Sequence, residues 1–316
     1  MSKFLKKCLL AGAILLLVGG LVFLVSFAST GFDIRKMSGS VITEGKYTEL
    51  GKSDSIVLNI QDSDLTVRFY DGEKITVDYM NEATERGKLK SEVTVVEENG
   101  NLVIREKTSW VVLSIFDFTS TRITVSIPKD RVVSINSKTD NGDVVIQLTE
   151  GASLSSLSVE TDNGDIDTRS ELSVLGRLEL ETNNGDVSLG FVRASSLEIS
   201  TDNGDVDLRG GEISSGAHIE TDNGDIDIDG RIVAESFSVE TDNGEIGGDD
   251  GVVDARRITV ESDNGDVEMR LAADRAAYTV TVKSSTGRKN IENGGSGERV
   301  LNIRTSNGDI EISFAN

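Results

Sequence analysis

Apolar and polar residues alternate along most of the chain beyond residue 55, in short segments separated by glycine-containing turns. In the second half, apolar residues fall six and four positions before a recurring asparagine, and three and five positions after it. Around Asn203 these positions hold Leu197, Ile199, Val206 and Leu208. Because successive side chains of a strand point to opposite faces, each pair predicts a short strand with one buried face.

The asparagine belongs to a motif centred on Thr-Asp-Asn-Gly-Asp, and its copies are separated by steps of 22, 21, 19, 20, 20, 21 and 43 residues. A worn copy at 284–287 divides the last step. A third inward position, ten residues after the turn, is filled by Ile213, Val233 and Val253. A fixed period of this length is typical of units that bury their apolar faces only by stacking. The turn residues, which we interpret as structural, are Asn141, Gly142, Asn163, Gly164, Asn184, Gly185, Asn203, Gly204, Asn223, Gly224, Asn243, Gly244, Asn264, Gly265, Asn307 and Gly308.

Residues 138–316 therefore predict an all-β solenoid with three-sided rungs of about 21 residues. Asn-Gly between alternating segments is also the strongest hairpin signal, so an antiparallel meander is the alternative. The turn, its length and all the apolar columns repeat together, whereas a meander requires only alternate turns to be alike. The pattern therefore favours stacked rungs. We expect the turn asparagine to tolerate a positive φ and the glycine to adopt one freely.

Residues 53–137 alternate less regularly and predict a β head that caps the solenoid. Strands are expected at 74–79, 92–96, 102–106 and 122–127, and 61–64 resembles a worn first copy of the turn. The apolar stretch 110–118 contains Trp110, Phe116 and Phe118. We interpret it as a cover for the open end of the first rung, because solenoid ends need protection. The alternative is an interaction loop that contacts the bilayer or a partner.

The N-terminal segment predicts a single transmembrane helix. Residues 8–28 carry no charge and are long enough to cross a hydrocarbon layer of roughly 30 Å. The lysines of the basic flank 1–7 are expected to stay in the cytoplasm, which places the rest of the chain outside, with 29–52 as a juxtamembrane stalk. A signal peptide cleaved after Ala28 is the alternative, although secretory apolar cores usually span only about 7 to 15 residues.

Composition changes this picture mainly through charge. The 32 Lys and Arg residues against 54 Asp and Glu give a net charge of -22, which argues against nucleic acid as a partner. A cationic partner or a bound metal ion fits better. The chain has one Cys and one His, His218, which we expect to be a solvated outer residue. We predict no catalytic residues, and no cofactor is required.

Several segments resemble the LiaG-like adhesin family of bacterial envelope proteins. The similarity rests on the basic start and anchor, Gly31-Phe32-Asp33, the pre-repeat segment 123–129 (Ile-Thr-Val-Ser-Ile-Pro-Lys) and the repeated turns. It implies a right-handed parallel β-helix-like solenoid at the bacterial cell membrane, with the C-terminal region extracytoplasmic. It implies no catalytic residues. The expected function is a binding or structural module of the envelope, whose partner is a cell-wall polymer, a cationic peptide or another envelope protein.

Two columns of acids flank the turns, and like charges on neighbouring strands destabilise a sheet unless solvent or cations relieve them. Calcium is the natural candidate because it accepts carboxylate oxygens in flexible geometry. No EF-hand loop is present, and loosely held counterions are the alternative. The candidate metal ligands are Asp162, Asp165, Asp202, Asp205, Asp222, Asp225, Asp263 and Asp266.

A β-helix polysaccharide lyase or hydrolase is the remaining alternative, because such enzymes use paired carboxylates. The acid pairs recur in every rung, whereas an active site requires a local break in the repeat. The stretch 283–299 is the least regular part of the solenoid and the place where such a break is expected.

Overall fold

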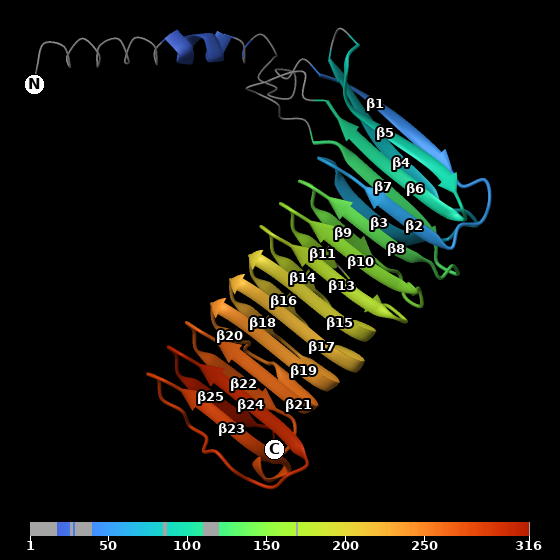
Figure 1. The fold of residues 1–316 in the computed structure, drawn as a ribbon. Coiled ribbons are helices and arrows are strands. Elements are labelled where there is room, and N and C mark those ends of the chain that lie inside the picture. The colour runs from blue at the N-terminus through green and yellow to red at the C-terminus, as the bar shows by residue number, and fades with distance from the viewer. Residues whose placement is uncertain are drawn as a thin grey trace, which may run out of the picture.

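The chain forms a rod of strands that stack along its length (Figure 1). The computed structural model describes residues 18–25, 28, 40–84, 87–109, 120–168 and 170–315. The strands of the N-terminal third are β1 (Ser40–Thr48), β2 (Ser55–Asn59), β3 (Asp64–Tyr70), β4 (Thr76–Thr84), β5 (Leu89–Glu98), β6 (Asn101–Thr108) and β7 (Arg122–Pro128). The described part of the chain is all-β apart from residues 18–25, residue 28 and a short 3-10 helix, η2 (Arg275–Ala277).

The repeats contribute shorter strands to the same stack. They are β8 (Ser134–Thr139), β9 (Val144–Gln147), β10 (Ser156–Thr161), β11 (Ile166–Thr168), β12 (Leu172–Ser173), β13 (Arg177–Thr182), β14 (Val187–Leu189), β15 (Val192–Asn203), β16 (Val206–Leu208), β17 (Gly211–Asn223), β18 (Ile226–Ile228), β19 (Arg231–Asn243), β20 (Ile246–Gly247), β21 (Val252–Ser262), β22 (Val267–Leu271), β23 (Tyr278–Ser284), β24 (Arg299–Thr305) and β25 (Ile310–Phe314). Every strand pairing among β8 to β25 is parallel. The repeats are therefore stacked rungs, and the meander alternative is wrong.

The head is where the antiparallel pairing occurs. β4 pairs with β1, β7 and the start of β5, and β5 pairs with β6. Asn99 and Gly100 join β5 to β6 with φ values of 52° and 81°, the left-handed pair that a two-residue hairpin requires. The four strands expected at 74–79, 92–96, 102–106 and 122–127 are confirmed as β4 to β7. Part of the predicted stalk 29–52 is wrong, because residues 40–48 form β1.

The head and the repeats share continuous sheets. β2 lies between β6 and β8, and β3 lies between β7 and β9. The rung made by β2 and β3 is therefore inserted between a later rung of the head and the first repeat. The worn copy at 61–64 forms the corner of this rung, and the Asn141 Nδ2 donates to Asp62 Oδ1 at 2.9 Å. The alternation read from the sequence continues into the head without a break.

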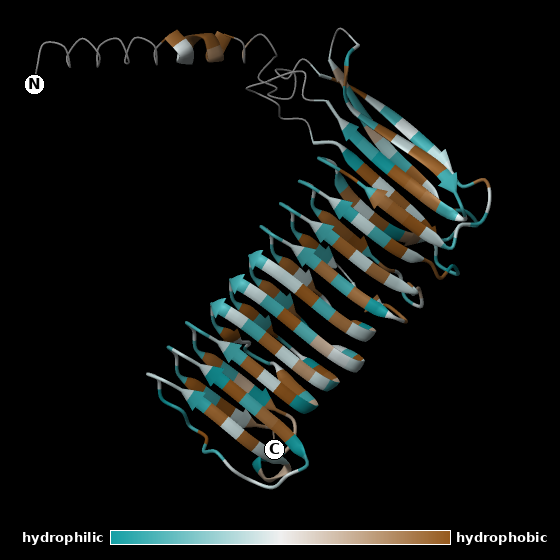
Figure 2. Ribbon diagram, in the orientation of Figure 1, coloured by the Kyte–Doolittle hydropathy of each residue, from teal (hydrophilic) through white to brown (hydrophobic). Residues whose placement is uncertain are grey.

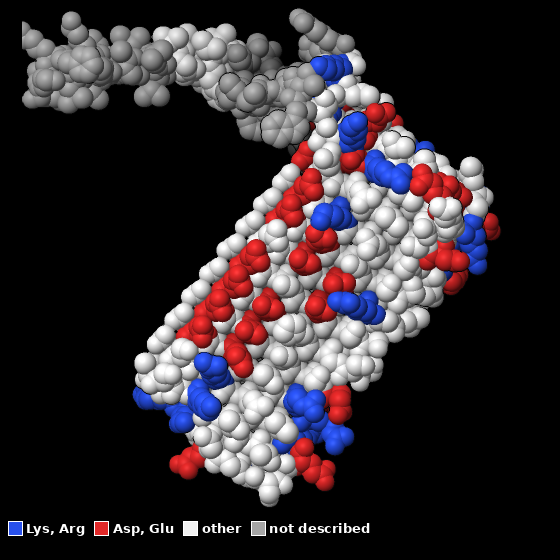
Figure 3. Space-filling model, viewed as in Figure 1, with Lys and Arg blue, Asp and Glu red and all other residues white. Residues whose placement is uncertain are grey.

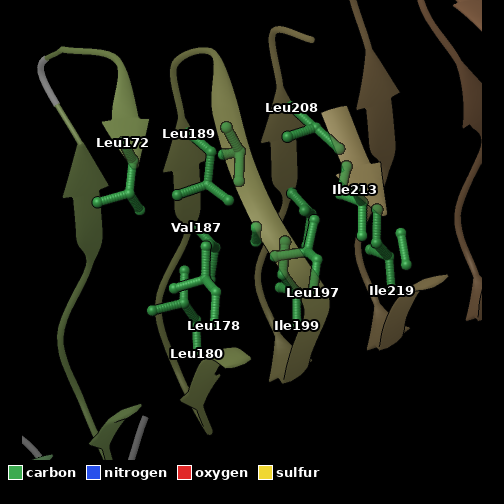
Figure 4. Close-up of a cluster of buried hydrophobic side chains, with 14 of the residues drawn as sticks. Leu172, Leu178, Leu180, Val187, Leu189, Leu197, Ile199, Leu208, Ile213 and Ile219 are labelled. Carbon is green, nitrogen blue, oxygen red and sulfur yellow. The ribbon is translucent and has the colours of Figure 1, made fainter. Parts of the chain in front are cut away.

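One hydrophobic core runs the length of the rod. The bands of apolar residues in Figure 2 follow the alternation along each strand. In Figure 4, Leu178, Leu180, Val187 and Leu189 of one rung lie beside Leu197 of the next, and all point into the rod. Stacking buries these positions almost completely, with exposures of 0–2 %. Each rung therefore depends on its neighbours for most of its apolar burial.

The prediction that Val233 points inward is wrong. Val233 is 38 % exposed, whereas its neighbours Ile232 and Ala234 are buried at 0 % and 8 %. Ile232 pairs with Gly211 and Val253, so this side of the rung begins nine residues after Asn223 instead of eight after Asn203. Because inward and outward positions alternate, one added residue reverses the direction in which a side chain points.

The last rungs stack out of sequence order. β24 pairs directly with β21, and β23 pairs only with β24, so the final copy of the motif lies inside the worn copy at 284–287. The loop 285–298 then covers the C-terminal end. Gly294 pairs with Val280, and the Asn290 side chain donates to and accepts from the backbone of Ile312. The irregular stretch 283–299 therefore contains a cap on the solenoid.

At the N-terminus, residues 18–25 are helical. Within the described parts of the chain, no helix is both long and apolar enough to span a membrane. Most of the predicted transmembrane segment 8–28, the flank 1–7 and residues 29–39 lie outside the described residues. The same holds for the predicted interaction loop with Trp110, Phe116 and Phe118.

Candidate binding surface: stacked corners and acidic columns

The glycines of the repeated corners are required by close backbone approach. A Cβ added to Gly164, Gly185, Gly204, Gly224, Gly244, Gly265 or Gly308 would lie 1.7–2.3 Å from the carbonyl oxygen of the corner glycine on which it stacks. None of these glycines has a positive φ, and Asn99 is the one described non-glycine residue that has. The expectation that the turn asparagines and glycines use the left-handed region is therefore wrong. The stacking distance, and not the turn geometry, excludes a side chain.

The turn asparagines form a ladder along the rod. Each Nδ2 donates to the Oδ1 of the asparagine in the adjacent rung, at 2.8–3.2 Å. The series runs from Asn141 to Asn264 and then passes to Asn307, which donates to Asn264 because β24 and β25 stack there. Such amide ladders stabilise stacked β structures. At the ends of the ladder, Asp62 and Thr286 take the place of an asparagine.

From Thr182 onward, the threonine or serine before each repeated turn is buried and its hydroxyl donates to the corner of the rung on which it stacks. Thr182, Thr201, Thr221 and Thr241 are 1–2 % exposed, and each Oγ1 donates to the carbonyl of the glycine in the preceding rung at 3.0–3.2 Å. These carbonyls are the same ones that exclude a Cβ. The same glycine carbonyl therefore accepts the threonine hydroxyl and lies against the corner glycine of the next rung.

The acid after each glycine is a backbone ligand. An Oδ1 of Asp143, Asp165, Asp186, Asp205 and Asp225 accepts the backbone N–H of the acid in the next rung, at 2.7–3.1 Å. Asp266 accepts from the N–H of Asp309 in the same way. A carboxylate that accepts an N–H is a strong, charge-assisted acceptor. This column therefore links successive corners, and each carboxylate keeps one oxygen for solvent or a ligand.

The acid before the asparagine has a weaker structural role. Asp162 Oδ1 accepts from Asn183 at 3.5 Å, and Asp263 Oδ1 accepts from Ser306 at 3.1 Å. Asp202 and Asp222 use their backbone carbonyls, which accept from turn asparagines. The candidate pairs such as Asp162 with Asp165 therefore lie on either side of one corner. Within the residues that the structure describes, no three His, Cys, Asp or Glu side chains are grouped to hold a metal ion.

Further acids form columns on the outer faces. Figure 3 shows them as lines of acidic side chains along the rod. One register column contains Lys138, Glu160, Glu181, Ser200, Glu220, Glu240, Glu261 and Arg304, so that cations stand at both ends. Partial burial, followed by repulsion from Glu220 and Glu261, raises the pKa of Glu240. His218 lies on the same face, half exposed, with Nε2 3.4 Å from Glu220.

The other face holds a concentrated acidic hollow of about 530 Å³. It opens at Gly247 and Gly248, where Gly247 pairs with the larger Asp227 of the adjacent rung. The acids that line it are Asp225, Asp227, Asp229, Glu245, Asp249, Asp266 and Glu268. Partial burial, followed by repulsion from Asp207 and Asp225, raises the pKa of Asp227. The free energy of the folded state therefore contains a repulsion at this hollow that a bound cation would reduce.

Buried carboxylates in the head were not identified from the sequence, among them Glu106 and Glu49. Glu106 is 6 % exposed and accepts the backbone N–H groups of residues 61–63 at 2.9–3.0 Å, together with the hydroxyls of Ser63 and Ser91. Glu49 accepts from Ser53, Ile75 and Arg131. The signal for Glu106 was present, because Leu102 and Ile104 precede it at the inward positions of the same alternation. An acid in that register is expected to have buried donors.

The family assignment follows from the match to the whole repeat region and most of the head. The model of the Toastrack DUF4097 family matches residues 53–313. The chain belongs to the Toastrack DUF4097 family. No curated protein matches this Toastrack chain. The narrower LiaG-like assignment stays a prediction.

Three solved structures are similar to this Toastrack protein. A putative adhesin from Bacteroides fragilis has 15 % identity and a TM-score of 0.43, over 86 % of this chain and 97 % of that one. A putative adhesin from Parabacteroides distasonis has 11 % identity and a TM-score of 0.42, over 87 % and 98 %. A putative lipid binding protein from Parabacteroides distasonis has 16 % identity and a TM-score of 0.31, over 88 % and 97 %.

Proposed function

We propose that this Toastrack protein is a non-enzymatic binding module of the bacterial cell envelope, and that its acidic faces bind a polycationic partner such as a cationic peptide. The observation that carries the proposal is the acidic hollow beside Gly247, which seven acidic residues line. A positively charged side chain placed there would relieve the repulsion that raises the pKa of Asp227. The same rod offers parallel acidic columns, so a partner with repeated charges could occupy several rungs together.

The role of the hollow can be tested with substitutions that leave the residues of the repeated corners unchanged. Among the residues that the structure describes, the side chains of Asp227, Asp229 and Glu268 have no hydrogen-bond or ion-pair partner, so their neutralisation leaves the hydrogen-bond network intact. The first variant carries Asp227→Asn, Asp229→Asn and Glu268→Gln. The matched control removes the same charge from exposed acids elsewhere, through Glu73→Gln, Glu92→Gln and Glu292→Gln.

The measurement is fluorescence anisotropy of a labelled oligolysine peptide titrated with the full chain at several salt concentrations. We expect binding that weakens with salt, a loss of roughly tenfold or more in the first variant, and a change of about twofold or less in the control. Equal losses of affinity in the two variants would mean that peptide binding depends only on the net charge of the chain. Absence of binding by the unsubstituted chain would reject a polycationic partner.

The membrane arrangement belongs to the same proposal. Residues 8–28 form the single transmembrane anchor, residues 1–7 stay in the cytoplasm, and a right-handed solenoid projects outward. A cysteine introduced by Ser214→Cys on the exposed surface of β17, in a Cys8→Ser background, reports the side of the membrane. Labelling by an impermeant maleimide in intact cells is the expected result, with labelling only after lysis as the contrary one. The intact mass distinguishes an uncleaved anchor from a chain cleaved after Ala28.

A further inference from the structure

The outermost strands at the two ends of the rod differ in how their free edges are covered. At the C-terminal end, β23 is the outermost strand, and the loop 285–298 covers it. The backbones of Gly294 and Val280 hydrogen-bond to each other, and the Asn293 side chain accepts the N–H of Val282. At the other end, β1 pairs with β4 and with no other described strand. The second edge of β1 therefore presents backbone N–H and C=O groups that no described strand pairs with.

β1 has few of the features that usually protect such an edge. It is nine residues long, contains no proline, and keeps an uninterrupted register with β4 from Ser40 to Thr48. Natural edges are commonly protected by short length, proline, bulges, charged side chains or a covering loop, and among the described residues β1 has only the charges of Glu44 and Lys46. Val41 and Ile42 are 48 % and 38 % exposed on this strand. β1 is therefore a suitable template for an added strand.

The charges of β1 are complementary to a second copy of β1. Glu44 and Lys46 lie on its outer face, two residues apart, with Gly45 between them. If two copies pair antiparallel about a two-fold axis at Gly45, Glu44 lies opposite Lys46 of the second copy, and Lys46 lies opposite Glu44. Residues directly opposite in an antiparallel pair have Cβ atoms about 4.5–5.5 Å apart, which suits an ion pair. One two-fold axis therefore forms both pairs.

We propose that β1 is a dimerisation edge, through which two copies of this chain join their sheets by antiparallel pairing centred on Gly45. Lys46 is 3.1 Å from Asp78, and both side chains are partly exposed, so Lys46 remains free to contact a second carboxylate. Tyr79 lies across Gly45 on the inner face, where an added Cβ would meet its ring at 2.3 Å. The inner face of β1 is thereby occupied, and the backbone edge remains for a partner.

The other terminal strand of the head does not have this complementarity. β5 carries Glu92, Glu97 and Glu98 against one lysine, Lys90. Lys90 is largely buried and its Nζ lies 3.0 Å from Glu82, so it is already paired within the chain, and a second β5 would meet mainly the carboxylates of this strand, which is unfavourable. The acidic columns of the repeats oppose self-association in the same way. The neutral pattern of β1 therefore favours this edge for a second copy.

Charge reversal tests the pairing. The full chain, kept in a mild detergent because of its apolar segment 8–28, is studied by sedimentation velocity over a range of concentrations. We expect a concentration-dependent dimer that Glu44→Lys or Lys46→Glu weakens roughly tenfold or more, because each places two like-charged pairs at the edge. A mixture of the two variants is expected to restore dimers, because the Glu44→Lys chain then faces the Lys46→Glu chain. Circular dichroism verifies that each variant is folded.

Cysteine cross-linking tests the register. In a Cys8→Ser background, differently tagged Glu44→Cys and Lys46→Cys chains are mixed and oxidised. We expect the mixed disulfide in large excess over either self-linked product, because positions 44 and 46 face each other across the axis. A monomer at every concentration overturns the proposal. So does a dimer that neither charge reversal weakens, which would indicate association through the apolar N-terminal segment.

Discussion

The head and the repeats close the same kind of corner in two different ways. In the repeats, each corner is completed by its neighbours through small contacts: an asparagine amide, a threonine hydroxyl and one aspartate oxygen per rung. In the head, one buried carboxylate, Glu106, accepts three backbone N–H groups of the corner at residues 61–63. The repeats therefore distribute the stabilisation of each corner over several separate contacts, whereas the head corner at residues 61–63 depends mainly on one carboxylate, Glu106.

The largest expected effect is the loss of Glu106. Glu106→Ala leaves three corner N–H groups and two hydroxyls without their shared acceptor, and we expect the free energy of unfolding to fall by about 3–5 kcal/mol. The measurement is urea unfolding followed by circular dichroism. Glu92→Ala removes an exposed acid from the adjacent strand and is the control, with an expected change within about 0.5 kcal/mol. Similar losses in both variants would contradict the assigned role of Glu106.

The next effect concerns the stacking distance in the repeats. Gly204→Ala places a Cβ 1.9 Å from the carbonyl oxygen of Gly185, so the backbone must shift, and we expect a loss of roughly 2–3 kcal/mol. Gly247→Ala is the matched control, because its added Cβ meets its nearest atom at an ordinary 3.7 Å. Thermal unfolding of the two variants compares them directly. Tolerance of Gly204→Ala would mean that the rungs can separate at little cost.

These two positions show what the sequence could and could not reveal. The repeated turn and the period-two alternation were sufficient to predict parallel rungs, because both describe local chemistry that recurs at a fixed distance. The reason for each glycine was wrong, since it depends on the distance between rungs and not on the turn itself. The inward position of Glu106 was readable, but the identity of its donors was not. Its backbone N–H donors lie more than 40 residues away, in a rung inserted out of chain order.

The order of the last rungs was beyond sequence reasoning for a similar reason. The copies of the motif at Asn264 and Asn307 are separated by 43 residues, with a worn copy between them. Spacing alone predicts that the worn copy stacks between the two. The structure places it outermost, where the loop 285–298 can cover it. The stacking order of the last rungs therefore follows from the protection of an open strand edge, which is visible only in the three-dimensional structure.

A change of pH is expected to act in opposite directions on the two regions. Burial raises the pKa of the Glu106 carboxyl, but hydrogen bonds from Ser91, Ser63 and two backbone amides outweigh it and lower the pKa below 4.5. Its contribution to stability is therefore complete above about pH 4.5 and is lost as the pH falls through the lowered value. The pKa of Asp227 is raised above 3.8 and that of Glu240 above 4.5, so their protonation favours the folded state as the pH falls.

Hydrogen exchange read by mass spectrometry, corrected for the intrinsic pH dependence, separates the two responses. From pH 7 downward, we expect protection in β18 and β19 to rise first, while protection at the corner 61–63 stays constant and then falls in stronger acid. Asp227→Asn is expected to remove part of the gain in β18. A uniform loss of protection along the rod would contradict the comparison.

A smaller effect is expected from one member of the asparagine ladder. Asn223→Ala removes the bonds that Asn223 donates to Asn203 and to the carbonyl of Asp202, and the bond that it accepts from Asn243. All three are exposed, so we expect a loss of about 0.5–1.5 kcal/mol in the free energy of unfolding. Asn307→Ala, at the last asparagine of the ladder, should cost less, because it breaks one amide bond and a long contact with Thr286. Thermal unfolding of both variants tests this order.

The smallest expected effect is that of calcium. The carboxylates that follow the corner glycines already accept backbone N–H groups, so one oxygen of each acid has a partner without a metal ion. In the head, the corresponding acceptor of corner N–H groups is the buried carboxylate of Glu106. We expect millimolar calcium to raise the thermal midpoint no more than sodium chloride at matched ionic strength does, because counterions then act through screening. A large and saturable rise would instead show specific sites, since a ligand of the folded state stabilises it by mass action. Asp202→Asn and Asp205→Asn together would then reduce the rise, and the corners would differ from the head in binding a metal as well as in their hydrogen bonds.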